Sequence, residues 1–201
     1  MIATKDEIKR LLTITSMTQE ELLDQLIPIV EDDIRTYCNN GFADPDVYIR
    51  SGEISFTHNS GATADTINLN ISTNEDGFVE AQFKAGQTVQ VQGAYNNDGF
   101  FDVETVSSTV LTLYTRANRP YFQVLVTEDE DVLVQINKVV YPSALKNIVA
   151  QMCKYKLSNH DYSVSAETVS RYHVTYNTDF VNGYPKNIMS GLNRWRVPVL
   201  I

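Results

Sequence analysis

The sequence has no long run of basic residues and no long run of apolar residues. Its 16 Lys and Arg stand against 25 Asp and Glu, giving a formal net charge of −9 that opposes unaided binding to nucleic acid or to an anionic membrane. No segment approaches the roughly 20 apolar residues of a membrane-spanning helix. Residues 1–12 are rich in charge where a secretory signal needs apolar residues, so we expect a protein that stays in the cytosol.

Cysteine is almost absent, since Cys38 and Cys153 are the only two in the chain. Both fall within segments whose pattern predicts amphipathic helices, where a buried thiol is the usual state. Two isolated cysteines cannot by themselves complete a zinc site. We therefore interpret both as buried structural thiols, in preference to a disulfide or a metal pair.

The chain also lacks the motifs of common enzymes, with no Gly-rich phosphate loop, serine elbow or paired-cysteine motif. The histidines, His58, His160 and His173, are scattered, and a local pair such as His160-Asp161 is more often exposed to solvent than catalytic. The acidic run at residues 128–131 lacks the spacing and the glycine of a calcium loop and is more typical of a solvated hairpin tip. We predict no enzyme activity, with no catalytic residue, metal site or cofactor.

Helical patterns begin the chain. Thr4 with Glu7, and Thr18 with Glu21, have the spacing of a capping box, which predicts the starts of two helices. Across residues 22–37 the apolar side chains recur every three or four positions. This spacing predicts one apolar stripe along the second helix.

Helical patterns also end the chain. We expect Gly41 to close the second helix in the left-handed conformation. A third helix is predicted from Pro142 to about Ser158, because proline is well suited to a first helical turn. Residues 159–179 are expected to be partly extended. A short last helix and an apolar tail follow them.

The middle of the chain, from about residue 47 to residue 141, has the pattern of strands instead. Its β-branched and aromatic residues alternate with polar ones between Gly and Asn turns. Asp98-Gly99 predicts a hairpin between Val91 and Val103. Eight short strands suit a barrel or a sandwich, and they are expected at residues 53–57, 66–71, 78–83, 88–91, 100–106, 110–114, 122–127 and 132–140.

These patterns predict an α+β fold in which a β module is inserted into a helical domain. The N- and C-terminal parts, residues 1–46 and 141–201, are expected to form a small α-helical bundle. Residues 47–140 are expected to form an all-β domain that resembles a barrel or a sandwich.

Several segments of the two helical ends carry a resemblance to a known family. They are the segment Thr18–Tyr37 that ends in Asn39-Asn40-Gly41-Phe42, the helix start Tyr141-Pro142, the pair Tyr162-Ser163, and Gly183-Tyr184-Pro185 before a short helix. In these residues the chain resembles the head-tail connector proteins of tailed bacteriophages, also called adaptor or head-completion proteins. The β insert departs from the simplest members of that family. It resembles small β modules inserted into several phage structural proteins.

The resemblance implies a structural protein of the virion neck. In that family a helical bundle forms a ring, commonly dodecameric, that docks under the portal protein and receives a stopper or tail-completion protein. The chain is then expected to form a homo-oligomeric ring, to be made in the host bacterial cytoplasm and to join the DNA-filled head to the tail. Double-stranded DNA would pass through the lumen without specific binding, and no membrane would be involved.

On the family's pattern, the C-terminal stretch is expected to contact the portal. The candidate residues are Tyr184, Pro185, Ile188, Leu192, Trp195, Val199 and Leu200. For the ring interface we expect the second helix to meet the third helix of the next subunit, and the candidates are Ile34, Tyr37, Met152 and Tyr155. The apolar arm at residues 184–201 is expected to lack contacts inside its own subunit until a neighbour covers it.

An alternative function from another class stays open. The chain could be a binding module without enzyme activity, in which the β insert recognises a glycan or a protein and the helices serve as a stalk. Six aromatic residues could then form a sugar-stacking face, although such residues more often fill a core. They are Tyr95, Phe100, Phe101, Tyr114, Tyr121 and Phe122.

Overall fold

The computed structural model divides the chain into two compact units. The β unit contains Met1 and Gly41–Tyr141, and the helical unit contains Ile2–Asn40 and Pro142–Ile201. The β unit thus begins at Gly41, before the expected boundary at residue 47, because its first strand already starts at Ala43. The structure describes residues 1–59, 63–70, 77–115, 124–129, 132–158, 166–169, 172–175 and 179–198, without the side chains of 166–169 and 172–175.

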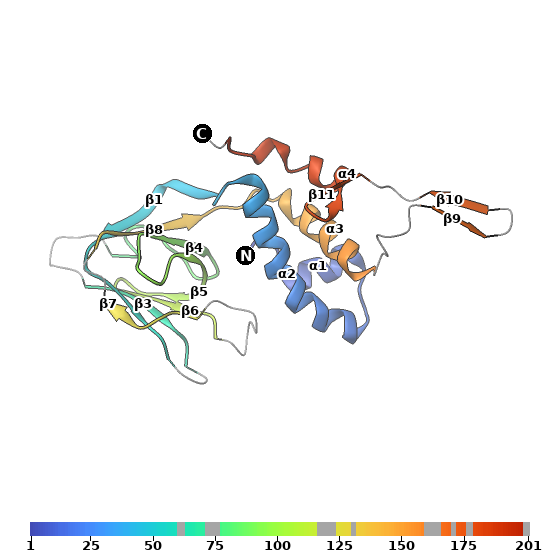
Figure 1. Ribbon diagram of the computed structural model, residues 1–201. Coiled ribbons are helices and arrows are strands. Elements are labelled where there is room, and N and C mark those ends of the chain that lie inside the picture. Colours follow the sequence, from blue (N-terminus) through green and yellow to red (C-terminus); the bar gives the residue numbers. More distant parts are fainter. Residues whose placement is uncertain are drawn as a thin grey trace. The chain divides into compact units, whose positions relative to one another are not determined.

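The helical unit contains three longer helices that contact one another in pairs (Figure 1). They are α1 (Lys5–Leu12), α2 (Met17–Cys38) and α3 (Leu145–Leu157), and they are followed by the short α4 (Lys186–Ser190) and a 3-10 turn at Asn193–Trp195. Two small antiparallel hairpins belong to the same unit. They pair β9 (Ala166–Val169) with β10 (Tyr172–Thr175), and β11 (Phe180–Val181) with β12 (Tyr184–Pro185).

The ends of the first two helices confirm one sequence prediction and correct two. At α1 the Thr4 hydroxyl accepts from the Glu7 amide at 3.2 Å and the Glu7 carboxylate accepts from the Thr4 amide at 3.0 Å, so the capping box is confirmed. The second box is wrong, because α2 already begins at Met17 and Thr18 lies inside the helix. The left-handed residue that closes α2 is Asn39, with φ 46°, and not Gly41.

The β unit is built on one antiparallel sheet of eight strands. The pairing of Val91 with Gly99 between two neighbouring strands confirms the predicted hairpin. Together with the helices, this sheet gives the α+β class that the sequence predicts. In spatial order the strands are β1 (Ala43–Ser51), β8 (Val134–Val139), β4 (Thr88–Gln92), β5 (Gly99–Val106), β6 (Val110–Leu113), β3 (Thr66–Leu69), β2 (Ile54–Thr57) and β7 (Glu128–Asp129).

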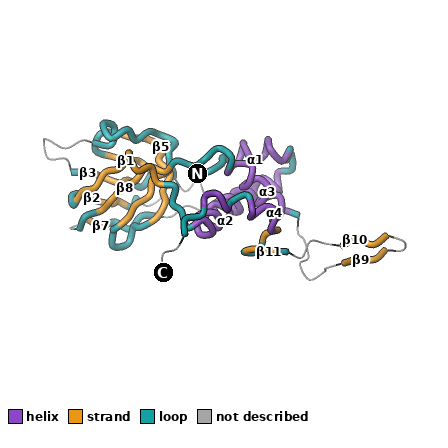
Figure 2. The backbone as a smooth tube through the Cα atoms, turned by 90° about the horizontal axis from the view of Figure 1, so that it is seen from above, coloured by secondary structure: helices purple, strands orange, loops and turns teal. Residues whose placement is uncertain are grey.

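The core of the β unit lies inside a curled sheet. Side chains from seven strands, β1 to β6 and β8, belong to one buried cluster. A flat sheet cannot turn so many strands toward one cluster, so the sheet must curl around it (Figures 1 and 2). A register irregularity between Val103 and Thr105 of β5 marks a bulge, which increases local twist and bends the sheet.

Two predicted strands are wrong. Residues 78–83 form turns, in which the Phe83 amide donates to the Phe78 carbonyl at 2.9 Å and the two buried rings meet edge to face at 5.7 Å. The apolar residues of this segment suggested a strand, but the amides of Ala81, Gln82 and Phe83 donate to carbonyls of residues 77–79, as in a turn. Residues 124–127 form no strand, and the rest of the predicted strand at 122–127 lies outside the described residues.

Candidate functional site

The C-terminal segment packs on the end of α2 within its own unit. The Val197 amide donates to the Cys38 carbonyl at 2.8 Å, and the Asn40 side-chain amide donates to the Trp195 carbonyl at 3.1 Å. Leu192 is fully buried. The expectation that residues 184–201 lack contacts inside the subunit is therefore wrong for Tyr184 to Val197, because this stretch caps the carbonyl end of α2.

Tyr184 is the largest fully buried side chain of the helical unit. Its hydroxyl donates to the carboxylate of Asp33 on α2 at 2.6 Å, and its ring lies 6.2 Å from that of Tyr155 on α3. The Lys156 ammonium lies 4.8 Å from the centre of the same ring. Tyr184 thus joins β12 to α2 and α3 inside one unit.

The predicted portal contacts therefore fall into three groups. Tyr184 and Leu192 are buried and hold the subunit together. Val199 and Leu200 lie outside the described residues. Partly exposed side chains, which a partner can reach, remain at Pro185, Ile188 and Trp195.

Two arginines that the sequence analysis did not single out flank Trp195. The Arg194 guanidinium lies 3.8 Å from the Trp195 ring centre, and that of Arg196 lies 5.0 Å from the Tyr37 ring centre. The Tyr37 hydroxyl donates to the Asn193 side chain at 2.9 Å. These contacts form a surface at the end of α2 in which cations stack on aromatic rings. The alternation of Arg, Trp and Arg in the sequence could have indicated this surface.

The four residues predicted for the ring interface differ in how exposed their side chains are. Ile34 and Met152 are fully buried in the core of the helical unit, so in this conformation their side chains offer no surface to a neighbour. Tyr37 and Tyr155 keep partly exposed rings. Helix α2 carries two apolar stripes, and Ile34 lies on the inner one, which faces the core.

The outer stripe of α2 consists of Leu22, Leu26 and Ile29. These positions follow the spacing i, i+4, i+7 and therefore share a helix face. Leu22 is 42% exposed and Ile29 is 50% exposed, while Leu26 is partly buried. In the sequence, Leu22 and Leu26 of this stripe could not be distinguished from the residues that face the core.

Charge is divided unequally within the helical unit. Residues 2–40 hold four Lys or Arg against eight Asp or Glu, a net charge of −4, whereas residues 142–201 hold seven against three, a net charge of +4. The helical unit is therefore neutral as a whole. The β unit holds five against fourteen, and so it carries the entire net charge of −9.

An ion pair between α1 and α3 gives the helical unit a pH dependence. The Lys146 ammonium lies 2.5 Å from the Glu7 carboxylate. The hydrogen bond from Lys146, and then that from the Thr4 amide, hold the pKa of Glu7 below its ordinary value of 4.5. Because the folded pKa is lowered, the stabilisation is present above about pH 4.5 and is lost as the pH falls through the folded pKa.

We expect Glu7→Gln to be less stable than the wild type at pH 7, by at most about 1 kcal/mol because solvent screens the pair. At pH 3 the two proteins should differ less, since this pH lies below the ordinary pKa of glutamate and the stabilisation that comes from the lowered pKa of Glu7 is being lost. Urea unfolding followed by circular dichroism at both pH values measures this. An equal difference at both would contradict the assignment, and Lys146→Met serves as the matched variant on the other side of the pair.

Both cysteines are buried and free, as the sequence predicts. Burial raises the pKa of the Cys38 thiol, and burial followed by the charge of Glu31 raises the pKa of Cys153 to about 12. A thiol held protonated in a core is a poor nucleophile and a poor metal ligand. These two residues therefore serve packing.

In the described part of the β unit, clusters of polar side chains hold loops in place through hydrogen bonds. His58 Nδ1 lies 3.0 Å from Asp65, whose carboxylate also accepts from the backbone amides of Asn59 at 2.8 Å and Leu125 at 3.0 Å. Glu128 accepts from the Asn96 side chain at 2.7 Å. Each carboxylate thus holds turns together. His160, Asp161, Glu130 and Asp131 lie outside the described residues, as does the side chain of His173.

Metal-binding clusters and membrane-spanning helices are both absent from the described ranges. Among these residues, no three His, Cys, Asp or Glu side chains gather closely enough to hold a metal ion. In the same part of the chain, no helix combines the length and apolar character needed to cross a bilayer.

Comparison with known proteins gives no family assignment: no protein-family model matches the chain, and neither does any curated protein.

Proposed function

We propose that this chain is a ring-forming structural protein of a phage neck, which docks on the portal and joins the DNA-filled head to the tail or stopper proteins. In this proposal the helices form the connector bundle, and the curled sheet is a barrel-like or sandwich-like insert. The proposal rests on the family resemblance of the helical ends. Two surfaces of the helical unit support it, the outer stripe of α2 and the surface around Trp195.

The observation that carries the proposal is the outer stripe of α2. Leu22 and Ile29 stay about half exposed on a helix whose other apolar stripe already fills the core. Complete burial of an exposed Leu or Ile side chain contributes about 1.5–3 kcal/mol, and these half-exposed side chains would contribute part of that in an interface. A stripe of this kind along one helix fits a contact that repeats from subunit to subunit.

The division of charge supports a head-to-tail arrangement. A closed ring needs two unlike surfaces on each subunit. The helical unit offers segments of opposite net charge, −4 in residues 2–40 and +4 in residues 142–201. If the first segment of one subunit faces the second segment of the next, the charges attract and identical surfaces repel each other.

The surface around Trp195 is the proposed portal contact. Pro185, Ile188 and Trp195 keep exposed area, and Arg194 and Arg196 stack on aromatic rings beside it. Aromatic and arginine side chains are enriched among residues that dominate binding energy.

Passage of DNA without binding agrees with the charges. The helical unit has no net charge and the β unit has −9. Stable binding to a DNA backbone requires clustered positive charge that replaces its counterions. A ring of such subunits would let DNA pass.

Electron microscopy of the purified protein with portal rings of its own phage tests the proposal. We expect end-on views with a closed ring of subunits and side views with that ring on one end of the portal. Trp195→Ala should leave the subunit folded and weaken this docking. Portal rings that stay bare at micromolar subunit concentrations would overturn the proposal.

A further inference from the structure

The outer face of strands β1, β8, β4 and β5 carries polar and aromatic side chains in register. Tyr48 on β1 pairs with Asn137 on β8, which pairs with Gln90 on β4, which in turn pairs with Phe100 on β5. Directly paired residues point to the same side of a sheet. Their chain neighbours, such as Ile49, Ile136 and Val91, belong to the core. This row therefore lies on the side away from the core, and we call it the amide face.

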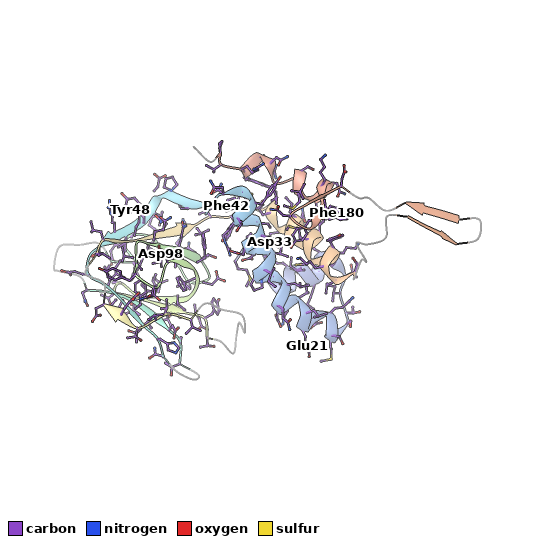
Figure 3. All side chains as sticks on the ribbon, viewed as in Figure 1. Glu21, Asp33, Phe42, Tyr48, Asp98 and Phe180 are labelled. Carbon is purple, nitrogen blue, oxygen red and sulfur yellow. The ribbon has the colours of Figure 1, made fainter. Side chains whose placement is uncertain are left out.

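A second row extends the amide face. Arg50 pairs with Gln135, which pairs with Gln92. Arg50 and Gln92 are exposed, and Tyr48 is 50% exposed on the outside of the β unit (Figure 3). The face thus presents an aromatic ring beside several side-chain amides.

Hydrogen bonds between the amides hold them in place. The Gln135 amino group donates to the Asn137 carbonyl oxygen at 2.6 Å, and the Asn137 amino group donates to the Gln92 carbonyl oxygen at 3.0 Å. Asn137 is 4% exposed although it lies on the outer side. The chain of bonds ends in an amino group at Gln92 and a carbonyl oxygen at Gln135. One end therefore offers donors and the other an acceptor.

We propose that the amide face is a binding site for a neutral carbohydrate. Sugar hydroxyls both donate and accept hydrogen bonds, so they match a surface that ends in an amide donor and an amide acceptor. The C–H face of a sugar ring is apolar and can stack on an exposed aromatic ring such as Tyr48. Tyr48 and Gln90 are two strand spacings apart, about 10 Å, which gives room for a short oligosaccharide.

Charge favours a neutral ligand over an anionic one. The β unit has fourteen acidic residues against five basic ones, and Arg50 is the one charged residue in the two rows. A nucleic acid, a sulfated polysaccharide or an anionic lipid surface would be repelled by the unit as a whole. A neutral polyhydroxyl ligand meets no such penalty.

The amide face could be found only from the strand register. Its amides come from β4 and β8, which are more than 40 residues apart in the chain. The aromatic set expected from the sequence differs. Phe101 lies in the core, and Tyr121 and Phe122 lie outside the described residues.

A printed array of neutral oligosaccharides of glucose, galactose, mannose and N-acetylglucosamine, with heparin as a polyanionic comparison, tests this inference. We expect the wild-type protein to bind at least one neutral oligosaccharide and not heparin. Titration with that oligosaccharide should show a loss of affinity of at least about tenfold for Tyr48→Ala. Gln92→Leu, which keeps the approximate size but removes the donor end, should weaken binding similarly.

Val79→Ala is the control, because Val79 is an exposed apolar residue of the same unit that lies outside the two rows. It should bind as the wild type does, and circular dichroism should show all three variants folded. Absence of binding to every neutral oligosaccharide, retention on heparin alone, or unchanged affinity in both Tyr48→Ala and Gln92→Leu would overturn the proposal. The inference is independent of ring formation, which these measurements do not require.

Discussion

A subunit that carries both Leu22→Asp and Ile29→Asp is expected to stay folded and to lose ring assembly. Both side chains are about half exposed in the single subunit, so aspartate at these positions remains solvated there. In an apolar interface the same carboxylates would be buried without partners, at a cost of several kcal/mol each. Since about 1.4 kcal/mol is a factor of ten in affinity, the contact between neighbours should weaken by more than about a thousandfold.

Sedimentation velocity of the protein mixed with portal rings measures this loss, together with circular dichroism of the free variant to verify the fold. Leu133→Asp is the control, because Leu133 is an exposed leucine of the β unit outside the helical surface. It should assemble as the wild type does. If the double variant formed rings at wild-type concentrations, the outer stripe of α2 would not be the contact between subunits.

The second large effect is expected at Leu192. This side chain is fully buried, and the turns around it connect α4 to the segment whose Val197 amide closes the end of α2. Leu192→Ala should lower the free energy of unfolding of the helical unit by about 2–5 kcal/mol, from lost apolar burial and the cavity left behind. For a unit of this size, the melting temperature should fall by at least about 8 °C.

Thermal unfolding followed by circular dichroism checks this result, with Leu11→Ala as the control at an exposed leucine of α1. The control should change stability by less than about 0.5 kcal/mol. A melting temperature of Leu192→Ala within about two degrees of the wild type would contradict the packing of the C-terminal segment described above.

The burial of Leu192 also affects how portal docking can be tested. A deletion of residues 191–201 would remove a core side chain and the cap of α2 together with the exposed surface. Loss of docking in that variant would not distinguish an unfolded subunit from a missing contact. Substitution at Trp195, which is partly exposed, separates the two.

Features set by neighbouring residues could be predicted from the sequence. The Thr4 and Glu7 capping box and the hairpin at Asp98-Gly99 each depend on a few consecutive side chains. The start of β1 could not be predicted, because Asp44-Pro45-Asp46 is typical of a turn, and these residues join a strand only because Ala43 and residues 48–51 on either side pair with the distant β8. Pairings of that kind depend on the whole fold.

The candidate surfaces, too, could be predicted only in part from the sequence. The helical period of residues 22–37 is plain in the sequence, but it does not say which apolar side chains face the core. Ile34 and Leu22 are therefore equivalent in the pattern and opposite in the structure, one buried and one exposed. The net charges of −4 and +4 in the helical unit can be counted from the sequence only after the bounds of the two units are known.

Light scattering of the purified protein, alone and mixed with portal rings of its own phage, tests the proposed connector role most directly. The proposal predicts a complex whose mass exceeds that of the portal by a fixed multiple of the 22.7 kDa subunit. That result is expected even if the free protein is monomeric, because weak contacts can close on a template. A stable monomer that adds no mass to the portal would contradict it, and the β unit would then be the part of the chain to examine for function.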